Sequence, residues 1–325
     1  MKGKLVLISI VLLLAMVLGA CAPAAATPAA GTAPQAKQFK IGMANFTLCC
    51  AYFIGMDKAV KTEASVYSNI QVISTDANGD AAKLNSDIED MIAKKVDGVI
   101  ISGGPLEQLP SALDSLKKAG IPVVLVDRQW SGGYTSYVGP DNFTIGQQDG
   151  QYIVNRLKSA GVLAVIKGGP ADNSIGLNRT KGVLDIVGKV PAIKVITAPD
   201  FGGWSEDGGL KQMENLLAAN KKIDAVFCEN DSMCLGAQRA IADANRTSEM
   251  FLCGVDGQKE ALQQIKNNSN YGCTGLNNSD QIGRNGLNRL MAILAGATPP
   301  LNTILPSPLI TLDNAVKFYD PNSLF

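Results

Sequence analysis

The sequence predicts an α/β protein in which parallel sheets are covered by helices on both faces. From Phe39 onward, short apolar segments alternate with amphipathic helical segments. The apolar segments are continuous runs, as strands require when both faces of their sheet are buried. The chain has 325 residues, of which 46% are apolar and 18% charged, so it can fill two domain-sized cores. We therefore expect two such sheets.

The predicted strands share a short run of branched or aromatic apolar residues, and they cover 39–44, 70–74, 99–102, 123–126, 162–166, 225–228, 251–255 and 272–276. Helical periodicity is clearest at 81–95 and 208–219, where apolar residues recur on one face. The stretch 127–141, rich in Gly, Ser and Tyr, separates the first group of strands and helices from the second. We expect it to be the first crossover between the two sheets.

The first residues predict export. Lys2 and Lys4 precede an apolar run at 5–18, which is shorter than the roughly 18 residues that a membrane span needs. The run ends at Leu18-Gly19-Ala20-Cys21 and resembles a bacterial lipoprotein leader, which implies that Cys21 is lipidated and becomes the mature N-terminus. A plain anchor helix is the alternative. Residues 22–38, mostly Ala, Pro, Thr, Gly and Gln, predict a flexible tether, so the bulk of the protein lies outside the cytoplasm.

Composition excludes several functions. The chain has 29 Lys and Arg, 29 Asp and Glu, and no histidine. A balanced charge argues against a nucleic-acid partner. Without an imidazole, Ser/His/Asp or Cys/His catalysis and the commonest zinc ligand are not available. A calcium loop at 76–87 fails because Ala81 occupies the place of its glycine, so Asp80 is expected to cap the next helix. We expect no metal and no cofactor.

Six cysteines follow Cys21: Cys49, Cys50, Cys228, Cys234, Cys253 and Cys273. In an exported chain an even number permits disulfides, but sequence alone does not choose among the pairings. A bridge between Cys253 and Cys273 is one possibility. Buried free thiols are the alternative.

Polar side chains gather just after predicted strands, where parallel sheets place their functional loops. They are Asn45 and the residues up to Phe53, then Asp127, Arg128, Asn230, Asp231, Asp256 and Asn277. Asp127 and Arg128 either present acceptors and donors to ligand hydroxyls or form a structural ion pair. Arg179 lies early in a helix, and Trp204 can offer a flat ring to a sugar. This combination suits a neutral, hydroxyl-rich ligand.

Asp127 and Asp256 are also candidates for the acid and the nucleophile or base of a glycosidase. A general acid needs a raised pKa, whereas the adjacent Arg128 would lower that of Asp127. Hydrolysis is therefore the weaker hypothesis.

Five segments carry a family resemblance, at 95–101, 120–128, 224–231, 254–257 and 280–283. In order and sequence they resemble the periplasmic sugar-binding proteins of the ribose-binding type, which share their fold with the effector core of lac-repressor-type regulators. The resemblance covers the chain from Phe39 to its end. It implies the type I periplasmic binding protein fold, with two lobes joined by three hinge strands. The implied lobes are 39–140 plus 278–307 and 141–277 plus 308–325.

The resemblance implies that the ligand is contacted by Asp127, Arg128, Arg179, Trp204, Asn230, Asp256 and Asn277, with the family's aromatic pair kept as Tyr52 and Phe53. Phe46 and Cys50, from the segment after the first strand, complete the predicted site. One segment departs from the family, which commonly has asparagine followed by proline and two aromatics, where this chain has Cys49-Cys50-Ala51-Tyr52-Phe53 with Phe46 just upstream. The lost amide removes a hydroxyl partner, and Phe46 narrows the pocket. These differences argue against ribose and leave a smaller polyol, a deoxy sugar or another pyranose.

We therefore expect a monomeric, lipid-anchored substrate-binding component of an ABC-type sugar importer that closes around its ligand and docks on a permease in the cytoplasmic membrane. A binding protein that signals to a chemoreceptor or receptor kinase is the alternative. A DNA-binding regulator would need a helix-turn-helix before Phe39, where the leader and tether lie.

Overall fold

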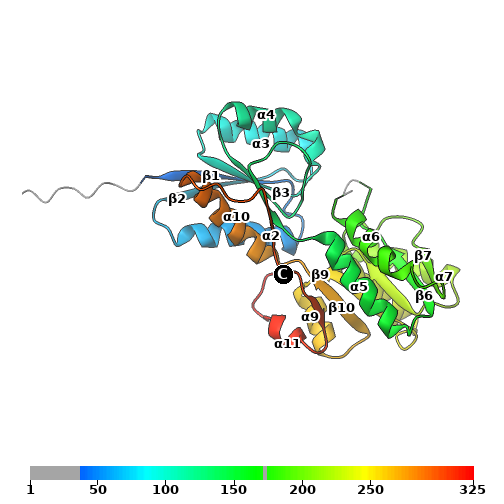
Figure 1. Ribbon diagram of the computed structural model, residues 1–325. Helices are drawn as coiled ribbons and strands as arrows, with labels where there is room; N and C mark the ends of the chain where they lie inside the picture. The colour runs from blue at the N-terminus through cyan, green and yellow to red at the C-terminus, as the bar shows by residue number, and fades with distance from the viewer. Residues whose placement is uncertain (1–36, 171–173) are drawn as a thin grey trace, which may run out of the picture. The chain divides into compact units, whose positions relative to one another are not determined.

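A computed structural model of the protein describes residues 37–170 and 174–325, which form two sheets of six strands each, flanked by helices (Figure 1). The predicted export signal, Cys21 and most of the predicted tether lie outside the described residues. The predicted fold class, two α/β lobes with mostly parallel sheets, is confirmed.

The first sheet has the order β11-β5-β4-β3-β1-β2, and all of its neighbouring strands are parallel. Its strands are β1 (Phe39–Asn45), β2 (Ile70–Asp76), β3 (Gly98–Ser102), β4 (Val123–Val126), β5 (Ser136–Gly139) and β11 (Asn302–Ile304). Its helices are α2 (Ala51–Ser65), α3 (Ala81–Ala93), α4 (Pro110–Lys118) and α10 (Ser279–Leu294), with the short helix η1 (Leu106–Gln108).

Both faces of the first sheet are buried because successive strand residues point to opposite sides. Ile101 and Leu125 pack with α3 and α4 on one face. Ile100 and Val124 pack with α2 and α10 on the other. As predicted, Asp80 caps α3, since its carboxylate accepts hydrogen bonds from the backbone N–H groups of Ala82 and Lys83.

The second sheet has the order β12-β10-β9-β8-β6-β7, and only its edge strand β12 is antiparallel to its neighbour. Its strands are β6 (Gly161–Ile166), β7 (Ile193–Thr197), β8 (Ala225–Cys228), β9 (Phe251–Asp256), β10 (Tyr271–Leu276) and β12 (Leu309–Thr311). Helices α5 (Asn142–Arg156) and α6 (Gly176–Val187) pack on one face. Helices α7 (Glu206–Ala219), α8 (Asp231–Asp243), α9 (Lys259–Lys266) and α11 (Ala315–Phe318) pack on the other.

The chain changes sheet three times, between β5 and α5, between β10 and α10, and between β11 and β12. The prediction of 127–141 as connecting chain was partly wrong, because β5 lies within it and pairs with β4. Four strands were missed in all: β5, β7, β11 and β12. The residue bounds predicted for the two lobes stay a prediction that these sheet memberships support.

The possible bridge between Cys253 and Cys273 is confirmed: the two residues are paired across β9 and β10 and form a disulfide. Cys49, Cys50, Cys228 and Cys234 are free thiols. The disulfide therefore joins the two strands that lead to Asp256 and Asn277.

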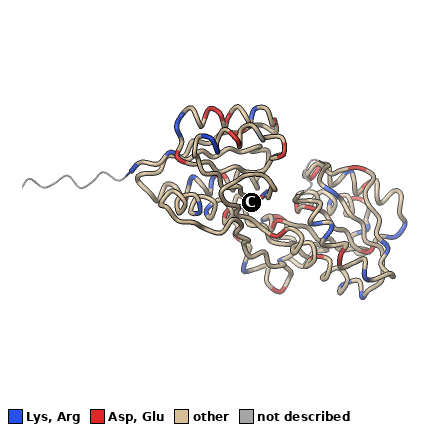
Figure 2. Tube along the Cα trace, turned by 45° about the horizontal axis from the view of Figure 1, so that its top comes forward, with Lys and Arg blue, Asp and Glu red and all other residues tan. Residues whose placement is uncertain are grey.

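Charges are mixed along the described chain, with basic and acidic residues interspersed over both sets of elements (Figure 2). Within 37–170 and 174–325, no helix is both long enough and apolar enough to cross a bilayer.

Candidate ligand-binding site

Five of the predicted site residues meet near the carboxyl ends of strands. Asp127 follows β4, Asp256 ends β9, and Asn277 follows β10. Tyr52 lies in the first turn of α2, and Arg179 lies near the start of α6. Since parallel strands present their carboxyl ends at one edge, the sheet order brings these side chains together.

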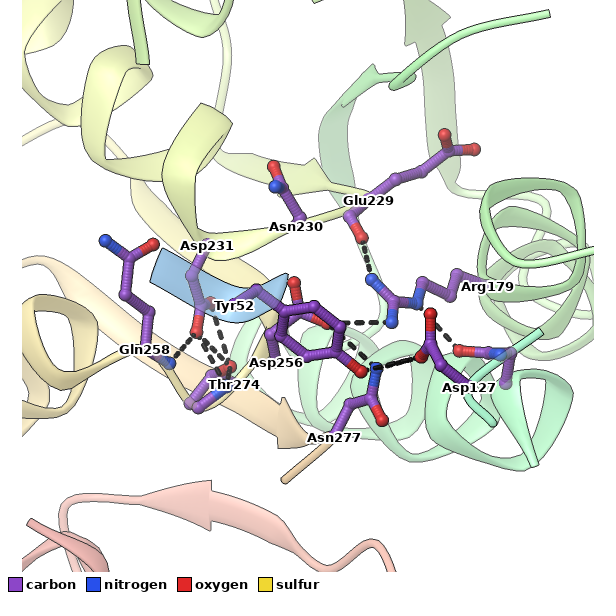
Figure 3. A network of polar contacts seen from close by, with 12 residues as sticks. Tyr52, Asp127, Arg179, Glu229, Asn230, Asp231, Asp256, Gln258, Thr274 and Asn277 are labelled. Carbon is purple, nitrogen blue, oxygen red and sulfur yellow. Dashed lines mark hydrogen bonds and ion pairs between the residues drawn. The ribbon is translucent and has the colours of Figure 1, made fainter. Parts of the chain in front are cut away.

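The five side chains form one continuous polar network (Figure 3). The Tyr52 hydroxyl donates to Asp127 Oδ1 at 2.6 Å, and Asn277 Nδ2 donates to the same oxygen at 3.1 Å. Asn277 Nδ2 also lies 3.3 Å from Asp256 Oδ1, which binds Arg179 Nη2 at 2.7 Å. The network thus links Asp127 of the first sheet to Asp256 of the second through a single amide.

Each nitrogen of the Arg179 guanidinium has a partner. It is 2% exposed, and its Nε donates to Asn142 Oδ1 at 2.8 Å while its Nη1 donates to the carbonyl oxygen of Glu229 at 2.6 Å. Helices α5 and α6 approach so closely here that a Cβ at Gly146 would clash with the carbonyl oxygen of Arg179. The guanidinium is therefore preorganised before any ligand arrives.

Burial controls the protonation of the network. It raises the pKa of Asp256 to about 6, although the Arg179 guanidinium opposes the rise. Burial also disfavours the charge of Arg179, but the carboxylates of Asp256 and Asp127 raise its pKa overall. Burial, with the charge of Asp127, raises the pKa of Tyr52, so its hydroxyl stays protonated and donates. At neutral pH Asp256 is therefore a charged acceptor and Arg179 a charged donor, and both side chains are buried.

Three predicted site residues adopt an unusual backbone conformation. Asp127, Trp204 and Asp256 have φ values of 68°, 60° and 121°, in the region that favours glycine. Aspartate tolerates the left-handed region better than most residues, whereas a bulky Trp rarely enters it. Such conformations persist where surrounding contacts enforce them, and they concentrate at functional sites.

Trp204 lies beside the loop that follows β6. A Cβ at Gly168 or Gly176 would clash with its indole, so both glycines are needed for the ring to lie where it does. Asn230 Nδ2 donates to the Trp204 carbonyl oxygen at 3.2 Å, and Asn230 Oδ1 caps α8 through the N–H of Met233. Asn230 therefore positions Trp204 and the start of α8 (Figure 3 shows its side chain beside Glu229 and Asp231).

Phe46, Phe53 and Arg128 gather around the turn at 103–104. Phe53 contacts Gly103 and Phe46 contacts Gly104, both of which have positive φ. Arg128 donates from Nη1 to the Gly104 carbonyl oxygen, from Nε to Ser174 Oγ at 3.1 Å, and from Nη2 to Glu107 at 3.3 Å. Arg128 therefore joins a turn of the first sheet to the chain just before α6.

Cys50 is the N-cap residue of α2 and is half-buried, whereas Cys49 is exposed. The Cys50 thiol donates to Cys49 and lowers the pKa of Cys49 to about 6, while the same contact and burial raise that of Cys50. As the N-cap residue, Cys50 lies one turn or less from Tyr52 and Phe53, and its contact with a ligand stays a prediction.

Glu229 and Asp231 support the site. The sequence pattern assigned no role to Glu229, and it predicted Asp231 only as a polar residue at the end of a strand. Glu229 accepts from the backbone N–H of Gly168 at 2.6 Å and from the Thr180 hydroxyl at 2.5 Å. Asp231 accepts from the N–H groups of Gly257 and Gln258, each at 2.8 Å, and so holds the turn after Asp256 (Figure 3). Both residues flank Asn230 directly after a buried strand, and that polar run was the available signal.

One cavity borders the network, and a second borders residues that bind the two arginines of the predicted site. One of about 490 Å³ is lined by Asp256, by Gly55 and Lys58 of α2, and by residues 320 and 322–325. Another of about 550 Å³ is lined by Asn142, which binds Arg179, and by Ser174, which binds Arg128. Both volumes fall in the range of small-molecule sites.

Known proteins resemble this chain over most of its length. The ribose import binding protein RbsB of Bacillus subtilis is 32% identical over 231 residues, which are 71% of this chain and 73% of that protein. The xylitol-binding protein of Mycolicibacterium smegmatis is 29% identical over 80% of this chain and 72% of its own length. A crystal structure of an ABC transporter solute-binding protein from Mycobacterium smegmatis with bound glycerol has a TM-score of 0.83 and 28% identity, covering 88% of this chain and 98% of that one. Residues 41–298 match the periplasmic binding protein domain, a family of solute-binding proteins, and the chain belongs to that family.

Proposed function

We propose that this protein is the extracytoplasmic substrate-binding component of an ABC-type importer, which binds a monosaccharide or a polyol between its two lobes and delivers it to a permease. The network that joins Asp127 of the first sheet to Arg179, Asp256 and Asn277 of the second carries this proposal. A ligand that takes over these contacts touches both sheets at once. It therefore favours a closed arrangement in proportion to the contacts that closure adds.

The chemistry of the network favours a neutral ligand that is rich in hydroxyl groups. A hydroxyl both donates and accepts, as a site with carboxylates, an amide, a guanidinium and a phenol requires. Asn277 Oδ1 is buried and has no hydrogen-bond partner among the described residues, so it offers an acceptor for a ligand hydroxyl. Arg179 binds Asp256, and Arg128 binds Glu107, so the arginines of the predicted site are already paired and leave no excess positive charge for an anionic ligand to neutralise.

Trp204 supplies the apolar part of the proposed site. Its side chain is partly buried against the core of the second sheet, and an indole can pack on the C–H face of a sugar ring. The relatives named for ribose and xylitol support a ligand of this class. Cys50 in place of an amide, and Phe46 at the turn, support a ligand other than ribose.

The lipid anchor at Cys21, the extracytoplasmic location, the monomeric state and the docking on a permease all belong to this proposal. A leader with the order of Lys2, the apolar run at 5–18 and Cys21 supports the anchor.

A thermal-shift screen tests the proposal on the protein from Lys37 onward, with ribose, xylitol, D-allose, glycerol, myo-inositol and deoxy sugars. A compound that binds the folded state alone at a free concentration about 100 times its Kd adds about 2.7 kcal/mol to the free energy of unfolding. We expect a clear rise in Tm with a sugar or polyol, its loss in Trp204→Ala and Asp256→Ala, and its retention in Val316→Ala. Val316 is 72% exposed on α11 and lies away from the network. A ligand-free preparation whose Tm none of these compounds raises would exclude sugar and polyol binding.

A further inference from the structure

The chain after α11 runs from the core of the second sheet to the candidate site. Phe318 and Tyr319 are partly buried against the core of the second sheet, and Lys266 Nζ lies 3.9 Å from the centroid of the Tyr319 ring. Lys259 Nζ of α9 donates to the carbonyl oxygen of Ser323 at 2.8 Å. We call residues 319–325 the tail. Its first part is thus fixed to the second sheet.

The far part of the tail contacts the first sheet instead. Phe325 packs against the core between that sheet and α2 and α10. Its ring lies edge-on to Tyr52, with centroids 5.1 Å apart and planes at 81°. Phe53 makes a similar edge contact with Tyr52 at 5.2 Å. Tyr52 is therefore enclosed by two aromatic rings, one from its own helix and one from the tail.

The position of Tyr52 matters because its hydroxyl binds Asp127 Oδ1 at 2.6 Å. A phenol held by two edge contacts has one orientation, and the carboxylate that it binds is oriented with it. The cavity of about 490 Å³ lies beside Phe325 and Gly55, and it would give the Tyr52 ring space to move if Phe325 were truncated. Phe325 thus contacts the ring whose hydroxyl binds the Asp127 oxygen that also accepts from Asn277.

We propose that Phe325 is a positioning residue, which orients Asp127 of the ligand site through Tyr52. It thereby couples the tail, which is fixed to the second sheet, to ligand binding by residues of the first sheet. Its effect on affinity rests on the proposed function, whereas its effect on Tyr52 does not. Edge-to-face aromatic pairs contribute enough that their loss weakens binding by about 3- to 10-fold when the positioned group contacts the ligand.

The first experiment needs no ligand. Tyrosine rings are labelled with ¹³C, and the Tyr52 signals are assigned by their loss in Tyr52→Phe. We expect Phe325→Ala to shift or broaden these signals, because a ring current and a steric contact are both removed. Phe325→Tyr should restore them, and Val316→Ala should leave them unchanged. Tyr52 signals that are the same in Phe325→Ala and in the wild type would overturn the proposal.

The second experiment measures Kd by calorimetry with ribose, xylitol and D-allose. We expect Phe325→Ala to weaken binding about 3- to 10-fold, Phe325→Tyr to stay within about 2-fold of the wild type, and Val316→Ala to have no effect. In a Tyr52→Leu background, Phe325→Ala should change Kd little further, because Phe325 affects binding through Tyr52.

The two experiments separate the possible failures. If the wild type binds none of the three compounds while the Tyr52 signals respond to Phe325→Ala, the proposed ligand class is wrong and the positioning of Tyr52 stands. If Phe325→Ala weakens binding as much in Tyr52→Leu as in the wild type, Phe325 acts through another path and the proposal is wrong.

Discussion

Arg179 and Arg128 both have buried side chains, yet the carboxylates that they bind lie in different surroundings. The Asp256 side chain, which binds Arg179, is 10% exposed, whereas the Glu107 side chain, which binds Arg128, is 50% exposed. Water can therefore solvate Glu107 if its arginine leaves, but it reaches Asp256 poorly. The surroundings of the carboxylate that is left behind, more than the burial of the arginine, therefore determine what each ion pair contributes to stability.

The largest effect is expected from Arg179→Met. The substitution leaves Asp256, Asn142 Oδ1 and the Glu229 carbonyl oxygen without the guanidinium that binds them. Removing one partner of a buried pair costs about 3–5 kcal/mol, so we expect the free energy of unfolding in urea to fall by that amount.

The double variant Arg179→Met/Asp256→Asn distinguishes the charge from the packing. An amide at 256 no longer carries an unpaired charge, so the double variant should regain part of the loss. If it is no more stable than Arg179→Met, burial of the Asp256 charge is not the reason for the effect.

A smaller effect is expected from pH, and it has a definite sign. Burial raises the pKa of Asp256 to about 6, above the ordinary value near 3.9 that it regains on unfolding. Between these two values the folded state binds more protons than the unfolded state, so this group contributes stability at low pH that is lost as the pH rises toward about 6. When the pH is lowered from about 7 to about 4, the free energy of unfolding of the wild type should therefore rise by roughly 1–3 kcal/mol relative to that of Asp256→Asn.

Urea unfolding at both pH values, with Glu107→Gln as the matched variant, measures this difference. Glu107→Gln is the same change from carboxyl to amide at an exposed partner, so it should leave the dependence intact. Ligand affinity should fall as the pH drops through about 6, because a protonated Asp256 is a weaker acceptor. A pH dependence that is identical in Asp256→Asn and in the wild type would show that another group titrates.

Local pattern was enough to predict the buried part of both sheets. Central strands such as β3 and β8 are continuous apolar runs, and the polar residues that follow β4, β9 and β10 mark the edge where Asp127, Asp256 and Asn277 meet. The edge strands gave no such signal. β11 and β12 have three residues each, and β7 is only partly buried.

Contacts between distant parts of the chain were beyond the sequence pattern. Phe325 and Tyr52 lie near opposite ends of the described chain, and nothing in the spacing of either residue indicates that their rings meet. Asn230 stays a predicted ligand contact, but the sequence did not indicate that its amide also caps α8 and binds the Trp204 carbonyl oxygen. Cap and ligand roles require the same residue type after a strand, so the sequence does not distinguish them.

The smallest effect is expected from Glu107→Gln. The substitution removes the carboxylate charge that faces Arg128 but keeps an oxygen that can accept from its Nη2. Pairs with an exposed partner contribute about 0–1 kcal/mol, so the free energy of unfolding should change by less than about 1 kcal/mol at moderate salt. The bonds of Arg128 to Gly104 and Ser174 remain, and they hold the guanidinium near its place. A loss in Glu107→Gln as large as that in Arg179→Met would mean that Glu107 is shielded from water in solution, and the contrast between the two arginines would then be wrong.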